Sequence, residues 1–245
     1  MLRVLSKEEK EELQKRGYMY EHLLCFYSMV ATKTFLYNES HPVFLTSFGE
    51  ADLILFGLGK TNKAVFECVK EVAELPISTL NIVAPTTLQG LPNLATRHID
   101  WDFHIDVSRF DLSLRGSKYK DLRYRVKQAE KMGYSTKVTR EFTPKHTYIL
   151  SRHMARRNYD VWDCEELLSL DRFFREHTHG LVMEAYRDDM LIGYDVVDFF
   201  EENKIMVVPL GIYLRVPLIS YYMMYQNLEY AKENGYEWVD IGPSC

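Results

Sequence analysis

The stretch LVMEAYRDDMLIGYDVVDFFEENKIMVVPLGIY, residues 181–213, contains three apolar runs separated by two short polar turns. The runs are rich in β-branched and aromatic residues, which favour strands. Asp188-Asp189 forms the first turn and 201–203 the second, and turns this short join only antiparallel neighbours. The sequence therefore predicts a three-stranded antiparallel meander with strands at 181–187, 190–200 and 204–213.

Helices and one further strand are expected on both sides of the meander. After it we expect a helix over 217–234 with Pro217 at its first position, then a strand at 236–242 in the same sheet. Before it, Ser117 and Gly133 are expected to cap and to end a helix over 118–132. Thr143 and Pro144 similarly predict the start of a helix.

The rest of the chain alternates between short apolar runs and helical patterns, which gives a mixed α/β (α+β) fold. The further elements expected are a capping box from Ser6 to Glu9 at the start of a helix over 7–16, strands at 43–48, 52–57, 80–85 and 102–108, and helices at 61–75 and near 163–176. This organisation predicts a mixed sheet that contains the antiparallel meander and is flanked by helices.

Composition places the chain among ordinary globular proteins. The 245 residues are 47% hydrophobic and 27% charged, with a formal net charge of -5. No apolar run approaches the length of a bilayer span. The four cysteines are scattered and no residues show metal-ligand spacing, so a reduced, cytoplasmic setting without a metal is expected.

Positive charge gathers on the segment 114–134, although the chain as a whole is acidic. On the helix expected there, basic residues recur at spacings of three and four, which places them in a stripe on one face. The stripe is either a solvated helix face or a surface for a phosphate-bearing partner. As candidates for polyanion binding we take Lys118, Lys120, Arg123, Lys127 and Lys131.

Three passages from about residue 104 to residue 245 resemble the GNAT acyltransferase fold. They are FHIDVSRFDLSLRGSKYKDLRYRVKQAEKMGY, the meander with Gly193 after its charged turn, and the ending YAKENGYEWVDIG. Within that fold the chain is similar to Fem-type aminoacyltransferases and to the catalytic domain of phosphatidylglycerol lysyltransferases. The resemblance implies two GNAT-like halves, at 1–110 and 111–245. The second half stops at IGPSC, where members of the family usually continue with another helix and strand.

The resemblance implies an acyl- or aminoacyltransferase that acts on an amine or hydroxyl acceptor. The donor is a thioester such as acyl-CoA or an aminoacyl-tRNA, and no permanently bound cofactor is implied. Its site corresponds to the end of the third meander strand and the following turn, where the candidate residues are Leu210, Gly211, Arg215, Leu218, Ile219 and Ser220. The family's Arg/Gln-x-x-Gly-x-Gly/Ala loop is replaced there by LRVPL, which shifts weight toward a donor other than CoA.

Acyl transfer requires a base for the attacking amine or a donor that stabilises the oxyanion. The meander offers four candidates for these roles, namely Glu184, Asp195, Asp198 and Tyr213. Because successive side chains of a strand point to opposite faces, only one of the two aspartates can face a central groove. The other reading of each residue is a polar group at a strand edge.

Two classes of function remain open on the sequence alone. The first is a cytoplasmic acyl- or aminoacyltransferase. The second is a non-catalytic module of the same fold that binds tRNA or another phosphate-rich ligand through the stripe at 118–131. A glycine and an arginine still occupy the donor-site turn, and they favour the enzyme.

Overall fold

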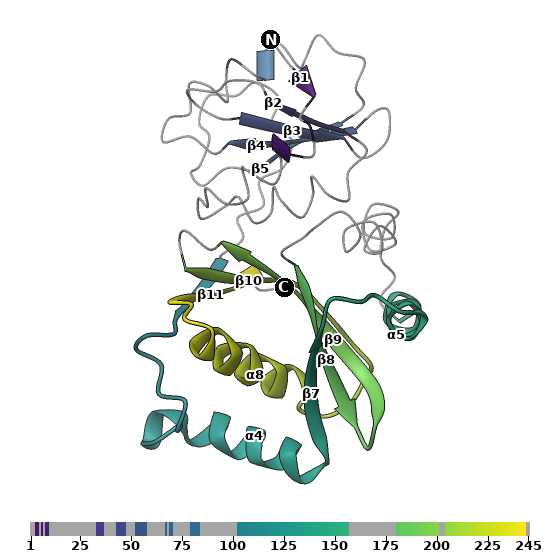
Figure 1. The fold of residues 1–245 in the computed structure, drawn as a ribbon. Helices are drawn as coiled ribbons and strands as arrows, with labels where there is room; N and C mark the ends of the chain where they lie inside the picture. Colours follow the sequence, from purple (N-terminus) through teal and green to yellow (C-terminus); the bar gives the residue numbers. More distant parts are fainter. Residues whose placement is uncertain are drawn as a thin grey trace. The chain divides into compact units, whose positions relative to one another are not determined.

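The computed structural model describes residues 102–156, 180–200 and 204–243 of the second half of the chain. In the first half it describes the short segments 3–4, 6, 8–9, 33–36, 43–47, 52–57, 67, 69–70 and 79–83. The chain forms two compact units, Met1–Ile99 and Asp100–Cys245 (Figure 1). The helix expected near 163–176 lies outside the described residues, as do most of the helices expected at 7–16 and 61–75.

The first unit contains a five-stranded sheet with the order β1-β2-β3-β4-β5. Neighbouring strands are antiparallel except β4 and β5, which run parallel. The bounds are β1 Arg3–Val4, β2 Lys33–Leu36, β3 Val43–Ser47, β4 Asp52–Gly57 and β5 Thr79–Val83. Ser6 and Glu9 exchange backbone-to-side-chain hydrogen bonds of 2.9 and 3.2 Å, which confirms the predicted capping box.

The second unit contains a six-stranded mixed sheet with the order β6-β11-β10-β9-β8-β7. The bounds are β6 Asp102–Asp106, β7 Tyr134–Thr139, β8 Leu181–Arg187, β9 Met190–Phe200, β10 Ile205–Tyr213 and β11 Trp238–Pro243. The boundary between the units falls before the expected division at 110–111, because β6 pairs with β11 and so belongs to this second sheet.

The predicted meander is confirmed, and so is the placement of 236–242 in the same sheet. Strands β8, β9 and β10 pair antiparallel, and β11 joins β10 in parallel. Asp188 and Asp189 both have positive φ, at 49° and 64°, as a two-residue hairpin turn of the type I′ kind requires. The sequence did not predict β7, which pairs with β8 at the edge of the sheet.

The helices of this unit are α4 Lys120–Lys131, α5 Pro144–Met154 and α8 Ile219–Glu233. Thr143 caps α5 and Pro144 follows it, as predicted. Ser117 does not cap α4; it begins the 3-10 turn η1, Ser117–Tyr119, so that Tyr119 precedes the α-helix. Pro217 is not the first residue of α8, because Leu218, with φ 61°, stands between them.

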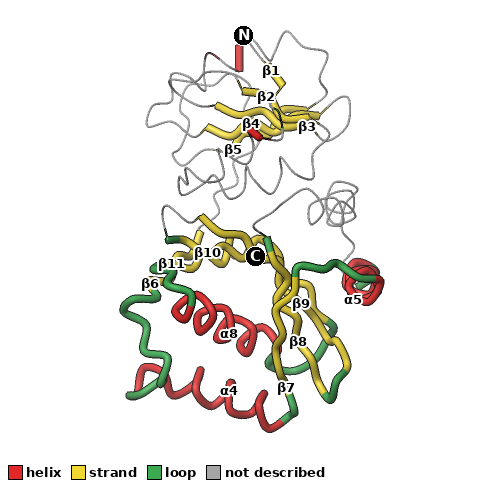
Figure 2. The backbone as a smooth tube through the Cα atoms, in the orientation of Figure 1, coloured by secondary structure: helices red, strands yellow, loops and turns green. Residues whose placement is uncertain are grey.

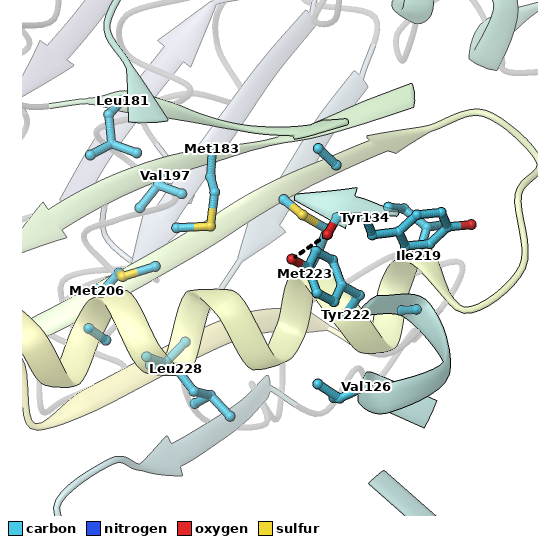
Figure 3. Close-up of a cluster of buried hydrophobic side chains, with 14 of the residues drawn as sticks. Val126, Tyr134, Leu181, Met183, Val197, Met206, Ile219, Tyr222, Met223 and Leu228 are labelled. Carbon is cyan, nitrogen blue, oxygen red and sulfur yellow. Dashed lines mark hydrogen bonds between the residues drawn. The ribbon is translucent and has the colours of Figure 1, made fainter. Parts of the chain in front are cut away.

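The helices cover opposite faces of the second sheet (Figures 1 and 2). α4 and α8 lie side by side on one face, where they bury apolar side chains from the alternate positions of β8, β9 and β10 (Figure 3). α5 packs against β9 and β10 from the other face. Strands β8 and β9 are consequently buried on both faces, and a polar side chain in either strand must find its partner inside the protein.

Candidate functional site

Strands β10 and β11 separate partway along their length. They pair at three positions, from Ile205–Trp238 to Val207–Asp240, although β10 continues to Tyr213 and β11 to Pro243. The register of β10 against β9 also shifts between Val207 and Leu210, where Pro209 contributes no N–H to the ladder. The second half of β10 is therefore paired with β9 alone.

Asp195 of β9 lies beside this unpaired part of β10 and is almost fully buried, at 1% exposure. Its Oδ1 accepts a hydrogen bond from the Tyr213 hydroxyl, and its Oδ2 accepts one of 2.6 Å from Asn227 Nδ2 of α8. The cross-strand partner of Asp195 is Gly211, and that of Tyr213 is Gly193. Three elements thus meet at one carboxylate.

Gly193 and Gly211 leave the space that the Tyr213 ring occupies. A Cβ at Gly211 would lie 2.8 Å from Tyr213 Oη and 2.9 Å from Asp195 Oδ1. A Cβ at Gly193 would lie 2.5 Å from the Tyr213 ring and 2.9 Å from the Ile212 carbonyl oxygen. Gly211 is itself exposed, so the hydroxyl of Tyr213 lies next to a position that solvent reaches.

Burial governs the protonation of this pair. Burial raises the pKa of Asp195 to about 6, even though the hydrogen bonds from Tyr213 and Asn227 act to lower it. Burial and the neighbouring Asp195 carboxylate raise the pKa of Tyr213 above its ordinary value, so the tyrosine remains protonated. The pair holds a carboxyl group that titrates near neutrality and a hydroxyl that can relay its proton.

Glu184 is on the opposite face of the sheet, where its cross-strand partner is Tyr194. Its Oε1 lies 3.0 Å from Nε2 of His146, a fully buried residue of α5. His146 Nδ1 accepts the Thr143 N–H at 2.9 Å, so the neutral ring carries its proton on Nε2, toward Glu184. Burial lowers the pKa of His146, and Glu184 opposes that effect.

Aromatic rings close this second cluster. Phe142 stacks on His146 with 5.1 Å between ring centroids, and Tyr194 meets both rings edge-on. Asp198 is also on the α5 face, since it lies four residues after Tyr194 on β9, and its Oδ1 accepts the Phe199 N–H. Of the four candidate catalytic residues, the fold brings Asp195 and Tyr213 together and places Glu184 and Asp198 elsewhere.

Several backbone polar groups in the turn between β10 and α8 are already hydrogen-bonded within the protein. The N–H of Leu214 donates to the Ile192 carbonyl and the N–H of Val216 to the Leu214 carbonyl, while the Pro217 carbonyl accepts the Tyr134 hydroxyl. The six predicted donor-site residues differ in exposure: Gly211, Arg215 and Ser220 are exposed, Leu210 and Leu218 are half-buried, and Ile219 is buried.

The basic residues of the predicted stripe divide into two groups. Arg123 is half-buried and donates to the carbonyls of Leu114 and Gly116, so its charge holds the preceding loop. The expectation that it projects outward with Lys120 and Lys127 is wrong. The other four predicted residues, Lys118, Lys120, Lys127 and Lys131, are exposed.

Sequence reasoning did not single out Asn227 or the pairing of His146 with Glu184. One signal for Asn227 was available: it falls in the stripe of buried residues along α8, between Met223 and Ala231, where an amide needs a buried partner. His146 stands three residues after the Thr143 cap, the position from which a side chain can reach back to the cap N–H.

Within the described ranges, no group of three or more His, Cys, Asp and Glu side chains could hold a metal ion. In the same residues, no helix has the length and apolar character needed to cross a membrane.

The sheet order, the separation of β10 from β11 and the intervening helix α8 define the GNAT fold, and solved structures confirm it. No family model matches the sequence, and no curated protein matches it either. The chain is similar to the crystal structure of the C-terminal domain of a putative lysylphosphatidylglycerol synthetase from Agrobacterium fabrum, with a TM-score of 0.69 and 15% identity over 98% of this chain and 80% of that one.

Two other solved structures share the fold. FemX matches with a TM-score of 0.60 and 10% identity, over 100% of this chain and 89% of that one. A tandem GNAT protein from the clavulanic acid biosynthesis pathway matches with a TM-score of 0.54 and 12% identity, over 99% of this chain and 89% of that one. The chain thus has the GNAT fold that its meander and terminal passages predicted.

Proposed function

We propose that the protein transfers an acyl or aminoacyl group from an activated donor to an amine or hydroxyl acceptor. The observation that carries this proposal is the position of the Tyr213–Asp195 pair, with Tyr213 at the end of β10, beyond the pairing of β10 with β11, and Asp195 beside it on β9. The backbone of Tyr213 itself contacts His153 Nδ1, but the edge of β10 before it, which β11 leaves unpaired, can hold an extended donor by its backbone groups. The Tyr213–Asp195 pair supplies acid–base chemistry beside that edge.

Tyr213 is the group that meets the acceptor in this proposal, because Asp195 is buried beneath it and the hydroxyl lies next to the exposed Gly211. As the acceptor nitrogen or oxygen attacks the donor carbonyl, its proton passes to Tyr213 Oη while the phenolic proton passes to Asp195. The bond from the carbonyl carbon to the donor oxygen or sulfur then breaks. The proton returns by the same path to that leaving atom, and Tyr213 and Asp195 regain their starting forms.

Asn227 keeps the carboxylate of this pair in place. The amide of Asn227 holds the Asp195 oxygen that Tyr213 does not use, which fixes the orientation of the carboxylate. The pKa of Asp195 near 6 leaves it ionised at neutral pH, yet basic enough to take the relayed proton.

The turn before α8 favours an aminoacyl-tRNA donor over acyl-CoA. A pyrophosphate needs several free backbone N–H groups at a helix N-terminus. In this turn the N–H groups of Leu214 and Val216 are already bonded, and Pro217 has none. Arg215 and the amides near Ser220 can still contact one phosphate or the donor carbonyl oxygen. The name of the putative lysylphosphatidylglycerol synthetase, whose C-terminal domain shares the fold, supports transfer of an aminoacyl group.

The test is a transfer assay with purified full-length protein. Labelled acyl-CoA and a set of labelled aminoacyl-tRNAs are each offered with small amines and with hydroxyl-bearing acceptors including phosphatidylglycerol. We expect product from an aminoacyl-tRNA, and a loss of about a hundredfold in rate for Tyr213→Phe. Tyr148→Phe, at a 60% exposed position on α5, is the matched control and should keep the parental rate.

A specific observation also supports a second function, that of a non-catalytic module that binds RNA: exposed lysines line α4. The same assay separates the two functions. If no donor yields product while the protein still binds tRNA, the enzyme proposal is overturned and the binding module stands.

A further inference from the structure

The outer face of α4 carries a line of exposed side chains that the proposed chemistry does not use. Lys120, Tyr124, Lys127 and Lys131 follow one another at spacings of four, three and four residues, which aligns them along one side of an α-helix. We call these four residues the lysine–tyrosine ridge. All are exposed, and Tyr124 is the most exposed large hydrophobic side chain in the described part of the unit, at 62%.

The remaining side chains of α4 hold the helix in place. Ala129 is buried in the core that α4 shares with α8, as is Val126 (Figure 3 shows Val126). Arg123 is bonded to the loop before the helix, and Arg125 pairs with Asp121 at 2.7 Å and covers the Tyr221 ring. Among the described residues, no ion pair involves a lysine of the ridge, and Glu130 is the acidic neighbour that remains exposed beside it.

Lys131 lies in the last turn, where a cation suits the helix dipole, but Lys120, Lys127 and the uncovered ring of Tyr124 add little to the stability of the helix. Like charges spaced four residues apart repel, and the exposed Tyr124 ring gains little from packing. From Lys120 to Lys131 the ridge extends about 17 Å, enough for several phosphates in a row. An aromatic ring between cations is the arrangement by which proteins bind an RNA strand: the cations contact phosphates and the ring stacks on an unpaired base.

We propose that the lysine–tyrosine ridge is a docking surface for RNA, with the lysines on the phosphate backbone and Tyr124 stacked on an unpaired base. The proposal rests on the proposed function in one respect: the RNA that the ridge binds is the tRNA part of the aminoacyl donor. A bilayer fits the ridge less well, because a membrane-surface helix presents a broad apolar face, and the apolar face of α4 is buried in the core.

The first experiment measures binding of deacylated tRNA to full-length protein by fluorescence anisotropy. The ridge variant replaces Lys120, Lys127 and Lys131 with Ala, and the control variant replaces three exposed basic residues elsewhere, Lys137, Lys145 and Arg152. Both lose three positive charges. We expect the ridge variant to bind at least about tenfold more weakly, with a salt slope smaller by about two, and the control to change less than about threefold.

The second experiment tests the ring. Tyr124→Ala should weaken tRNA binding by about tenfold, and Tyr124→Phe should keep it within about twofold, because stacking needs the ring and not the hydroxyl. Tyr148→Ala, at 60% exposure on α5, is the matched control and should bind as the parent does. Circular dichroism of each variant checks that the fold is retained.

Several outcomes would overturn the ridge proposal: a parent that does not bind tRNA, a control triple variant that loses as much affinity as the ridge variant, or a Tyr124→Ala variant with parental affinity. Binding to vesicles with 30% phosphatidylglycerol through the same residues, without tRNA binding, would assign the ridge to a membrane instead. If the ridge binds tRNA but no donor yields product, the ridge proposal stands and the transferase proposal fails. If transfer depends on Tyr213 and the ridge variant binds tRNA as tightly as the parent, the transferase proposal stands and the ridge proposal fails.

Discussion

Asp195 and Glu184 are two carboxylates on adjacent strands, nearly equal in burial at 1% and 6% exposure, and they differ in what lies opposite them. Asp195 faces α8 and accepts hydrogen bonds from two neutral donors, Tyr213 and Asn227. Glu184 faces α5 and lies against the ring of His146, a group that can itself take a proton. The partner, more than the depth of burial, decides what each carboxylate can do.

The different partners give the two carboxylates different proposed roles, Asp195 in the transfer reaction and Glu184 in holding α5 against the sheet. The Tyr213 hydroxyl over Asp195 adjoins the exposed Gly211, which is where the proposed transfer would take place. The rings of Phe142 and Tyr194 pack against the ring of His146. His146 in turn contacts Glu184, and this contact holds the first turn of α5 against β8. We therefore expect changes at Asp195 to affect transfer, and changes at Glu184 to affect the stability of the α5 face.

The largest expected effect is on catalysis. Asp195→Asn removes the group that receives the relayed proton, and kcat should fall by about a hundredfold or more. Glu184→Gln should leave kcat within about threefold, because its neighbours are on the other face. Steady-state rates with the donor identified in the transfer assay provide the comparison. An equal loss in Glu184→Gln would place the chemistry on the α5 face.

The two glycines beside Tyr213 should differ in stability. Gly193→Ala brings a Cβ to 2.9 Å from the Ile212 carbonyl oxygen, which the backbone cannot readily avoid, and should cost about 3 kcal/mol of unfolding free energy. Gly211→Ala meets the end of the Tyr213 side chain, which can swing away from Asp195, and should cost about 1 kcal/mol of unfolding free energy while lowering the transfer rate no more than Tyr213→Phe does. Urea unfolding followed by tryptophan fluorescence measures both. Equal losses of unfolding free energy in the two variants would contradict this prediction, because they would mean that the Tyr213 side chain cannot move away from an added Cβ at residue 211.

Acidification should raise the unfolding free energy through Asp195, on the α8 face of the sheet, and lower it through His146, on the α5 face. Because the pKa of Asp195 is raised to about 6 in the folded protein, acidification from pH 6 to pH 4 stabilises the fold through this group. Because the pKa of His146 is lowered, acidification below about pH 6.5 destabilises the fold through that group. Asp195→Asn should thus lose roughly 2–3 kcal/mol more than the parent over this range, and His146→Gln should lose less.

Urea unfolding of the parent and both variants at intervals from pH 4 to pH 7.5 measures how the unfolding free energy depends on pH and so tests both predictions. A parental pH dependence in Asp195→Asn would show that the pKa of Asp195 is not raised in the folded protein. The double variant should combine the two single effects, since Asp195 and His146 are on opposite faces of the sheet.

The smallest effect on stability is expected for Tyr194→Phe, with Tyr213→Phe as the comparison. Tyr213→Phe leaves Asp195 Oδ1 without its donor and should cost about 1–3 kcal/mol. Tyr194→Phe removes a buried hydroxyl that has no hydrogen-bond partner among the described residues, and should leave the unfolding free energy unchanged or raise it by up to about 1 kcal/mol. A cost above 1 kcal/mol for Tyr194→Phe would reveal a partner for that hydroxyl.

Local signals account for what the sequence predicted well. The hairpin at Asp188-Asp189, the Thr143 cap and the helix end at Gly133 each depend on residues within a few positions of one another. The start of α8 shows where local rules fail. Pro217 suits a first helical position, but its carbonyl accepts the hydroxyl of Tyr134, and the helix begins after Leu218.

The candidate site depends on contacts that local rules do not reach. Strand alternation placed Asp195 and Asp198 on opposite faces, yet it could not say which face α8 covers. The Asn227 contact joins residues 32 positions apart, and it selects Asp195 over the other carboxylates. Arg123 shows the same limit, because helical spacing grouped it with the lysines, whereas its guanidinium turns back to the Leu114 carbonyl.

The pairing of β6 with β11 sets a constraint on how the second unit is made. β6 is synthesised before the other strands of its sheet, and its neighbour β11 after them. While the intervening chain emerges from the ribosome, β6 has an exposed edge and no neighbour, and loop closure across the whole unit must precede its pairing. Folding of this sheet should therefore be slow, and the unpaired β6 is the segment that a chaperone would most need to protect until β11 is made.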